Sequence, residues 1–365
     1  MVSRRSSDII FLAAAAFLAV FGLAMLSSAS SVLGYEKFGG AYFFVKRQLL
    51  HGFLPGIVLF FLFLSVDYRN LKRHAKIFLF FSVGLLALVF IPGLGAVYNN
   101  ARSWVSFGWF SFQPSEIVKL TFLIFLAAWF EARRGREVRD FMTGLFPFLA
   151  ALGVIAGLIM LQPDMGTMGI ILISSLVVYF VAGAPLAHIA GMGGLGVAAF
   201  FILIKVAPYR ADRLTTFLHP ELDPQGVGYQ INQALLAIGS GGILGLGYGQ
   251  SRQKFLYLPQ AYGDSVFAVM AEEMGFIFLL FFFFALAVFF FRGVRIAARA
   301  PDIFGRLLAT GIISWLAFQT LLNIGAMIGI LPLTGVPLPF ISYGGTALMT
   351  TLAAVGILGN ISRHS

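Results

Sequence analysis

The 365-residue sequence contains no cysteine, and only 11% of its residues are charged. The absence of cysteine excludes disulfides, metal sites with thiolate ligands and cysteine nucleophiles. The scarcity of charge, with 59% apolar residues and a mean hydropathy of +0.91, excludes a protein that stays dissolved in water. Recurring ten-residue amphipathic strand patterns are also absent, so a bundle of membrane helices is favoured over a β-barrel.

Long apolar segments divide the chain into candidate membrane spans, because about 20 apolar residues cross a ~30 Å hydrocarbon layer. Gly-Ala-Pro at 183–185 and a proline-rich stretch at 332–339 each split a longer apolar tract into two. The sequence therefore predicts an all-α polytopic membrane protein with ten transmembrane helices, forming one domain over residues 1–365. The expected spans lie at 9–35, 48–66, 77–98, 115–130, 141–163, two within 165–204, one at 265–291 and two within 307–362.

The distribution of lysine and arginine indicates which way the spans point. If the N-terminus is cytoplasmic, fifteen of the 25 cations fall in short inner loops and tails. Cytoplasmic loops of membrane proteins carry this excess, so both termini are predicted to lie in the cytoplasm. The same bias accounts for most of the net charge of +10, and no basic tail supports binding to nucleic acid.

The polar stretch at residues 206–264 is much longer than a connection between two helices requires. It falls on the outer side, between predicted helices 7 and 8, and its aromatic and apolar residues argue against disorder. Residues 230–238 are expected to form a short amphipathic helix that ends at a glycine-rich run. The glycines at 245, 247 and 249 then permit tight turns or close approach of the backbone.

Several ionisable residues near the outer boundary need a partner or a task, because isolated charge near lipid costs several kcal/mol. Glu116 and Lys119 are three residues apart and can form an intrahelical ion pair. Asp164 and Asp264 each precede an apolar segment, where an aspartate either caps the next helix or serves chemistry.

A pair of carboxylates and a set of cations complete the charged residues of the outer half. Glu272 and Glu273 fall inside a predicted span, so at least one should meet a cation such as Lys119 or be protonated. The outer cations suit a pyrophosphate, because arginine binds phosphate oxygens in a bidentate fork, and snorkelling to the interface is the alternative. These cations are Arg102, Arg210, Arg213, Arg252 and Lys254, with Trp104 and Trp109 nearby in the sequence.

Six motifs spread over nearly the whole chain carry a resemblance to a known family. They are Ala101-Arg102-Ser103-Trp104, Phe112-Gln113-Pro114-Ser115-Glu116 with Lys119, Gln162-Pro163-Asp164-Met165-Gly166-Thr167, Asp223-Pro224-Gln225-Gly226-Val227-Gly228-Tyr229-Gln230, Ala237-Ile238-Gly239-Ser240-Gly241-Gly242 and Gly335-Val336-Pro337-Leu338-Pro339-Phe340-Ile341-Ser342-Tyr343-Gly344-Gly345. The chain thereby resembles the SEDS proteins (shape, elongation, division and sporulation), which include FtsW and RodA. The resemblance implies ten transmembrane helices, cytoplasmic termini and a large outer loop between helices 7 and 8, in agreement with the prediction above.

The resemblance also implies a peptidoglycan glycosyltransferase that polymerises lipid II, an undecaprenyl-pyrophosphate-linked disaccharide peptide, on the outer face of the bacterial cytoplasmic membrane. The family's proposed catalytic aspartate matches Asp264. Many members read Pro-Glu-Ala-His-Thr-Asp at this point, whereas this chain has Gln260, Tyr262 and Gly263 in place of the Glu, His and Thr. The uninterrupted segment 251–259 is more similar to FtsW than to RodA.

A single carboxylate suffices for this reaction, because a lipid pyrophosphate leaves readily once its charge is neutralised. Asp264 is expected to take the proton from the GlcNAc 4-hydroxyl of one lipid II as that oxygen attacks the sugar C1 of the chain donor, inverting α to β. The motifs define no cofactor; Mg²⁺ or Mn²⁺ could assist at the pyrophosphate, yet no cluster of ligands identifies a metal site. Candidate substrate-binding residues are Arg102, Trp104, Gln113, Ser115, Glu116, Lys119, Asp164, Arg210, Arg213 and Lys254.

Expected partners are lipid II, a class B penicillin-binding protein acting as transpeptidase, and other membrane proteins of the division or elongation machinery. Two further functions stay open. Charges at membrane depth, such as Glu116 and Glu272, could serve a transporter that moves lipid II across the bilayer. A scaffold that only recruits the penicillin-binding protein is the other alternative. A polymerase should depend on Asp264, whereas a transporter should depend on the charges at membrane depth.

Overall fold

The computed structural model describes residues 7–98, 101–108, 110–133, 135–206, 216–217 and 226–364, and this part of the chain is mostly helical. The helices are α1 (Ile9–Ala29), α2 (Ser31–Phe38), α3 (Phe43–Gln48), the π-helical turn η1 (Leu49–Phe53), α4 (Leu54–Ser65), α5 (Arg69–Arg73), α6 (Ala75–Leu88), α7 (Pro114–Ala132), α8 (Arg136–Arg139), the π-helical turn η2 (Phe141–Leu145), α9 (Phe146–Met160), α10 (Met165–Val181), α11 (Leu186–Val206), α13 (Val227–Gly241), α14 (Val266–Arg299), α15 (Ile303–Met327) and α16 (Gly345–Arg363). A small antiparallel sheet has the order β1 (Gly95–Tyr98), β2 (Ala101–Ser106) and β3 (Ser111–Phe112).

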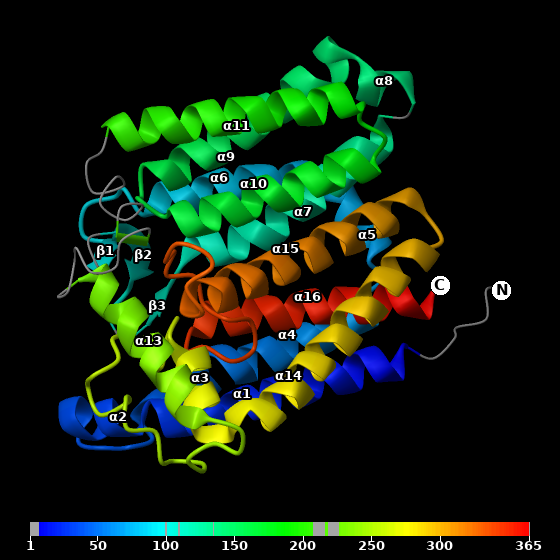
Figure 1. Ribbon diagram of the computed structural model, residues 1–365. Helices are drawn as coiled ribbons and strands as arrows, with labels where there is room; N and C mark the ends of the chain where they lie inside the picture. The colour runs from blue at the N-terminus through cyan, green and yellow to red at the C-terminus, as the bar shows by residue number, and fades with distance from the viewer. Residues whose placement is uncertain are drawn as a thin grey trace.

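The long helices run side by side in one bundle (Figure 1). The sheet, α2 and α13 lie at one end, called the sheet end below, and α5, α8 and the end of α16 lie at the other, called the termini end. The start of α1 belongs to the termini end as well, because the Asp8 N–H donates to Ser362 Oγ at 3.0 Å and Arg363 Nε donates to Ser7 Oγ at 2.7 Å. The chain therefore begins and ends its helical bundle on the same side.

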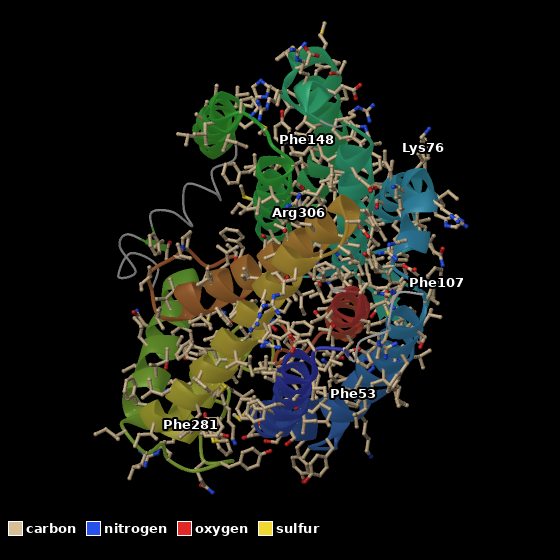
Figure 2. The ribbon with its side chains drawn as sticks, turned by 90° about the vertical axis from the view of Figure 1, so that its right-hand side faces the viewer. Phe53, Lys76, Phe107, Phe148, Phe281 and Arg306 are labelled. Atoms are coloured by element: carbon tan, nitrogen blue, oxygen red, sulfur yellow. The ribbon has the colours of Figure 1, made fainter. Side chains whose placement is uncertain are left out.

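Six helical segments in the described part of the chain are long and apolar enough to cross a membrane: Ile9–Ala29, Phe43–Ser65, Phe141–Met160, Val266–Arg299, Ile303–Met327 and Gly345–Arg363. Shorter apolar helices cover Ala75–Leu88, Met165–Val181 and Leu186–Ala198. Their outward side chains suit lipid: Phe281 of α14 is 64% exposed and lies at one edge of the bundle, opposite Lys76 of α6 (Figure 2). The protein is a multi-pass helical membrane protein, as its composition predicts.

Both predicted interruptions of apolar tracts are confirmed. Helix α10 ends at Val181 and α11 begins at Leu186, on either side of the 183–185 segment. Helix α15 ends at Met327 and α16 begins at Gly345, on either side of the proline-rich 332–339 segment. Proline lacks a backbone donor and fixes φ, so neither tract continues as one helix.

One predicted span is shorter than expected. The sequence predicts a span over 77–98, but α6 ends at Leu88 and residues 95–98 form β1. Pro92 and Gly93 (φ 86°) turn the chain, and β1 then pairs with β2 in the register Gly95 with Val105 and Ala96 with Trp104. The apolar residues after Pro92 belong to this sheet, which the sequence analysis did not anticipate.

Helix α14 is interrupted at Gly275, whose φ of 72° and ψ of 177° are not helical. Glycine alone adopts this conformation readily. The interruption exposes backbone groups, and the 242–247 segment supplies their partners. Backbone N–H groups of 246 and 247 donate to the carbonyls of 272 and 273, and those of 276 and 277 donate to 242 and 243, all at 2.9 to 3.1 Å. The predicted turn glycines therefore hold α13 against the break in α14.

The two parts of α14 differ in their surroundings. Residues 266–273 are all buried, whereas residues 276–299 alternate between buried and exposed positions. The second part is roughly 36 Å long at 1.5 Å per residue, enough to cross the ~30 Å hydrocarbon layer without the first. The part that follows Asp264 is thus enclosed by protein and does not itself face lipid.

Helix α16 is deeply enclosed, with residues 350–362 all buried. Small residues make this possible: a Cβ added at Gly356 would lie 2.5 Å from the Phe60 carbonyl oxygen of α4. Small side chains let helix backbones approach closely in membranes, where packing rather than the hydrophobic effect drives association. Helix α16 thus fixes the centre of the bundle, and the segment that precedes it lies at the sheet end.

Candidate functional site

Asp264 lies at the sheet end, one residue before the Ser265 N-cap of α14. Its carboxylate is partly exposed, and its Oδ1 accepts a long hydrogen bond of 3.4 Å from Gln230 Nε2 of α13. Its main-chain carbonyl accepts a shorter one of 2.8 Å from Asn323 Nδ2 of α15. Since Ser265 rather than Asp264 occupies the N-cap position, capping of α14 does not account for this aspartate.

Tyr262 stands beside Asp264 at the position where the family motif has histidine. Its ring packs on Phe44 and Tyr343, and its carbonyl accepts a hydrogen bond of 2.9 Å from the Tyr343 N–H. Burial, and secondarily the nearby charge of Asp264, raise the pKa of the Tyr262 hydroxyl above its ordinary value. Tyr262 therefore stays neutral at physiological pH and supplies a rigid wall beside the carboxylate.

Asp164 caps α10 and also gathers polar groups from α7. Its Oδ1 accepts from the Thr167 N–H at 3.1 Å, which confirms the predicted helix cap. Its Oδ2 accepts from Gln113 Nε2 at 3.1 Å and from Ser115 Oγ at 3.3 Å. Three predicted site residues are thereby brought together at the starts of two neighbouring helices.

Glu116 and Lys119 form the predicted ion pair, with 2.8 Å between Lys119 Nζ and Glu116 Oε1 and side chains only 2% and 1% exposed. The ammonium also donates to Gln319 Oε1 of α15 at 2.7 Å and lies 5.1 Å from the Trp315 ring centre. Gln319 Nε2 in turn donates to the Pro337 carbonyl at 2.8 Å. A buried ion pair needs such extra hydrogen bonds, because its own attraction barely offsets desolvation.

The 334–337 segment before α16 connects these groups. Its Val336 and Pro337 carbonyls accept hydrogen bonds of 2.8 Å from Asn323 and Gln319. A Cβ added at Gly335 (φ 71°) would lie 3.8 Å from Asp264 Oδ2. The predicted general base and the Lys119 ion pair are thus tied to one short stretch of backbone.

The same segment also meets the Asp164 side of the site. A Cβ added at Gly166, the second residue of α10, would lie 2.4 Å from Val336 Cγ2 and 3.0 Å from the Thr334 carbonyl oxygen. Only glycine allows α10 to approach so closely. The family-like motifs around residues 113, 164, 264 and 335, far apart in the sequence, therefore surround one region of the sheet end.

Of the predicted outer cations, Arg102 lies on β2 together with Trp104. The Arg102 guanidinium is partly exposed and donates from Nη2 to the Ile91 carbonyl at 3.4 Å. Its Nε lies 2.6 Å from where a Cβ at Gly95 would be, so the glycine makes room for the arginine across the sheet. Arg210 and Arg213 lie outside the described residues.

The sequence predicts that Lys254 is an outward-facing cation, but in the structure it is buried. The residue is 4% exposed, and its ammonium donates to Ser28 Oγ at 2.9 Å, to the Gly249 carbonyl at 2.7 Å and to Glu273 Oε1 at 2.9 Å. These three acceptors use all three ammonium hydrogens. The geometry therefore gives Lys254 a structural partner in place of a pyrophosphate, whereas its neighbour Arg252 is exposed.

The adjacent carboxylates of α14 both accept hydrogen bonds from the loop before Asp264. Glu273 meets a cation, as the sequence predicts, but that cation is Lys254 rather than Lys119. Glu272 accepts from Ser251 Oγ at 2.5 Å, from the Arg252 N–H at 2.9 Å and from the Gln253 N–H at 3.4 Å. The pair therefore anchors the 251–254 turn to the end of the first part of α14.

The sequence analysis assigned no site role to three polar residues of the site: Gln230, Gln319 and Asn323. Gln319 and Asn323 lie four residues apart, on one face of α15, and are 2% exposed. Uncharged polar side chains at this spacing inside a predicted span are the signal that would have found them, because their burial needs hydrogen-bond partners.

Two observations limit what else the sheet end holds. Among the described residues, no group of three histidine, cysteine, aspartate or glutamate side chains could hold a metal ion. An open groove of about 330 Å³ is lined by Ser31, Val32, Tyr35 and Glu36 of α2 and by Phe255, none of which is a predicted site residue.

The site consists of a partly exposed carboxylate among buried polar groups, at one end of a multi-pass helical bundle. The protein is thus a membrane protein with a polar site at one end of its bundle. The comparisons with known proteins specify the family. The model of the cell cycle protein family that comprises FtsW, RodA and SpoVE matches residues 8–365, and the chain belongs to this family.

Curated relatives align over nearly the whole chain. Stage V sporulation protein E of Bacillus subtilis (strain 168) is 43% identical over 365 residues, which cover 99% of this chain and 98% of the relative. A probable peptidoglycan glycosyltransferase FtsW of Geobacter sp. (strain M18) is 39% identical, with 97% and 96% covered.

Solved structures share the fold. A chain from a peptidoglycan synthase complex, studied for how it coordinates polymerization and crosslinking, aligns with a TM-score of 0.80 at 28% identity, covering 98% of each chain. The crystal structure of the rod shape determining protein RodA of Thermus thermophilus aligns with a TM-score of 0.71 at 28% identity, covering 98% of this chain and 97% of RodA. The higher identity to FtsW and Stage V sporulation protein E agrees with the prediction that the chain is more similar to FtsW than to RodA.

Proposed function

We propose that this protein is a peptidoglycan glycosyltransferase that polymerises lipid II into glycan strands on the outer face of the bacterial cytoplasmic membrane. The observation that carries the proposal is the position of Asp264. It is a partly exposed carboxylate that lies outside the N-cap position of its helix, and the 334–337 segment of a family-like motif lies beside it. Relatives that align over 97% of the chain bear the name peptidoglycan glycosyltransferase.

Asp264 acts as the general base of an inverting transfer. It accepts the proton of the GlcNAc 4-hydroxyl as that oxygen forms a bond to the anomeric C1 of the donor chain. The bond from C1 to the pyrophosphate oxygen breaks, undecaprenyl pyrophosphate leaves with the electron pair, and α becomes β at C1. One carboxylate suffices because the pyrophosphate is a good leaving group once its charge is neutralised.

The predicted substrate-binding residues take two roles in this proposal. Arg102, Arg210 and Arg213 hold pyrophosphate, with Trp104 beside Arg102 on β2, because guanidinium groups bind phosphate oxygens in pairs. The other residues form the walls and act through hydrogen bonds rather than through contact with phosphate: Gln113, Ser115, Glu116, Lys119 and Asp164. We withdraw the pyrophosphate role of Lys254, because its ammonium is fully hydrogen-bonded.

The proposed function also implies how the helices are placed in the membrane. Four further helices, α6, α7, α10 and α11, join the six apolar segments to give ten crossings. In the described residues, α6, α10 and α11 provide apolar stretches that are shorter than those six. The sheet end is extracytoplasmic and the termini end is cytoplasmic, which places residues 206–264 outside, between crossings 7 and 8. The excess of cations in the loops of the termini end supports this orientation. The whole chain, residues 1–365, is then one membrane domain.

No step in this reaction requires a metal held by the protein. The side chains of Gln230 and Asn323 bond to Asp264 through neutral amides, and the described residues hold no cluster of carboxylates that fits a Mg²⁺ or Mn²⁺ site. A divalent cation would instead arrive as the counter-ion of the pyrophosphate.

A class B penicillin-binding protein is the partner we propose, within the membrane machinery of division or elongation. The similarity to a chain of a peptidoglycan synthase complex supports this assignment, since that complex joins polymerization to crosslinking. The transpeptidase would crosslink the strands that this protein makes.

The test is polymerisation of purified lipid II by the full-length protein, with and without a class B penicillin-binding protein. Wild type is compared with Asp264→Asn and with Asp67→Asn, a control that removes a carboxylate at the termini end. All three must elute as monodisperse protein and unfold at similar temperatures. We expect glycan chains, cleavable by a muramidase specific for β-1,4 links, from wild type and the control, and none from Asp264→Asn.

Other outcomes point to the alternatives. Equal activity of Asp264→Asn would remove the general-base role. Failure of wild type even with its partner would favour a transporter or a scaffold. A transporter is then recognised by lipid II movement across vesicle membranes that depends on Glu116 and Lys119 and tolerates Asp264→Asn.

A further inference from the structure

Asn323 is a buried polar residue of α15 with an unusual pair of acceptors. The residue is 2% exposed, and its Nδ2 donates to the main-chain carbonyl of Asp264 and to that of Val336, both at 2.8 Å. Its Oδ1 is buried and has no hydrogen-bond partner among the described residues. A buried polar side chain in a membrane helix is costly, and the Oδ1 of Asn323 makes no compensating bond within the described part of the chain. The stability of α15 therefore does not explain the two hydrogen bonds that Nδ2 donates.

The Asp264 carbonyl needs an external donor for a local reason. Asp264 precedes the N-cap Ser265, so it lies outside the ladder of helical hydrogen bonds, in which the Ser265 carbonyl accepts from the Ala268 N–H at 3.0 Å. The direction of the Asp264 side chain is set by this backbone unit. Asn323 therefore holds the peptide from which the general base projects.

The second acceptor, the Val336 carbonyl, fixes the Asp264 peptide relative to the 334–337 segment. Val336 belongs to the 334–337 segment, where a Cβ at Gly335 would lie 3.8 Å from Asp264 Oδ2. Among uncharged side chains, only a primary amide offers two donors on one atom, so no aspartate, leucine or serine could tie both carbonyls at once. One side chain thus sets the distance between the general base and the segment beside it.

We propose that Asn323 is a positioning residue for the general base Asp264, an inference that rests on the proposed glycosyltransferase function. Asn323 does not touch the reacting atoms; it acts by fixing where the Asp264 carboxylate lies. A general base must lie within about 3.2 Å of the proton it accepts. A shift of about 1 Å is enough to reduce turnover roughly 100-fold.

The chain offers a matched control at the other end of the bundle. Asn360 of α16 is also 2% exposed, and its Nδ2 donates to the Leu64 carbonyl at 2.8 Å while its Oδ1 accepts from the Tyr68 N–H at 3.1 Å. It joins separate segments as Asn323 does, but it lies at the termini end. Replacement of either asparagine removes a buried amide of the same kind.

The experiment compares wild type, Asn323→Ala, Asn323→Ser, Asn360→Ala and Asp264→Asn as full-length proteins with lipid II. It measures initial rates against lipid II concentration, referred to the folded fraction found by size-exclusion chromatography and thermal unfolding. For Asn323→Ala we expect kcat to fall roughly 100-fold while KM changes less than about threefold. Asn360→Ala should lower the unfolding temperature to a similar extent and keep kcat within about twofold.

The outcomes separate the two proposals. If wild type polymerises and Asp264→Asn does not, the proposed function stands and the Asn323 variants report on positioning alone. Positioning is overturned if folded Asn323→Ala keeps its kcat, if KM rises with kcat unchanged, or if Asn360→Ala loses kcat equally. Asn323→Ser keeps one donor; if neither Asn323 variant folds, the residue is a folding determinant and the inference is also overturned. An inactive wild type removes the proposed function, and this inference with it.

Discussion

Lys254 and Glu273 form an ion pair, 2.9 Å between Nζ and Oε1, at the point where the backbone of α14 is interrupted. Their side chains are 3% and 0% exposed. The pair joins the loop before Asp264 to the first part of α14, and Ser28 brings α1 into the same cluster. Because both side chains are buried, their attraction and the added hydrogen bonds offset the cost of removing the charges from water.

We expect Lys254→Met to destabilise the protein by about 3–5 kcal/mol, because it leaves Glu273 buried without its cation. The double variant Lys254→Met/Glu273→Gln should recover much of this loss, since it removes both charges. Lys76→Met, which removes an exposed lysine at the termini end, serves as the control and should change little. Thermal unfolding in one detergent measures all four proteins.

The same variants decide whether Lys254 binds substrate. If its role is structural, the double variant should keep the wild-type KM for lipid II once it is folded. A KM that rises strongly in a protein of recovered stability would restore the pyrophosphate role predicted from the sequence.

Gly275 should tolerate no side chain. A Cβ there would lie 2.1 Å from the Gly245 backbone nitrogen, and its φ of 72° and ψ of 177° are open in practice to glycine alone. We expect Gly275→Ala to prevent the hydrogen bonds between residues 242–247 and 272–277 and to reduce the yield of folded protein severely. Gly153→Ala in α9 is the control, because a Cβ there meets nothing within 4 Å. In that helix alanine should be neutral or stabilising by about 0.5–1 kcal/mol.

Protease accessibility of the loops at the sheet end measures the effect of Gly275→Ala separately from the yield of folded protein. If Gly275→Ala folds with wild-type stability and unchanged cleavage, the interruption of α14 is not required and the helix can run straight.

Local rules of sequence predicted much of this architecture but not its long-range contacts. Proline and glycine at 183–185 and 332–339 end helices for reasons carried within a few residues, and the Asp164 cap and the Glu116 to Lys119 pair need only helical spacing. The partner of Glu273 could not be found in this way. Glu272 and Glu273 contact the 251–254 turn, which helical spacing does not reveal, and the helix is interrupted at Gly275 just after the pair.

The small sheet and the polar face of α15 escaped prediction for a different physical reason. Strand β1 pairs with β2 over only a few residues, and its apolar composition also suits the end of a membrane helix. Periodicity cannot separate the two in so short a stretch. Likewise, Gln319 and Asn323 acquire their roles only when the 334–337 segment folds back over α15.

Asp302 should make the termini end sensitive to acid. It caps α15 through the Gly305 N–H at 2.7 Å and accepts from Tyr68 and from Arg69 Nε at 2.9 Å. Burial alone would raise the pKa of Asp302, but the hydrogen bonds from Tyr68, Gly305 and Arg69 outweigh it and lower the pKa below 3.8. A carboxyl with a depressed folded-state pKa contributes stability that is complete above its unfolded pKa of about 3.9 and is lost as pH falls through the folded value.

The expected result is a difference in unfolding temperature between wild type and Asp302→Asn that stays constant from pH 7 to pH 5 and shrinks below about pH 4. Glu137→Gln, at an exposed glutamate of the same end, should show no such difference at any of these pH values. A wild-type advantage that persists undiminished at pH 3 would show that the charge of Asp302 does not stabilise the fold.

The Glu116–Lys119 pair differs from the Lys254–Glu273 pair because hydrogen bonds connect it to the segment beside Asp264. Lys119 holds Gln319, which holds Pro337 in the segment beside Asp264. Lys119→Met should cost about 3–5 kcal/mol, and Glu116→Gln/Lys119→Met should recover much of this. We nevertheless expect the double variant to raise the KM for lipid II by roughly ten-fold, or about 1.4 kcal/mol, because the wall loses its anchor. If stability and KM both return to wild-type values, the pair serves folding alone and the wall is held by Asn323 without it.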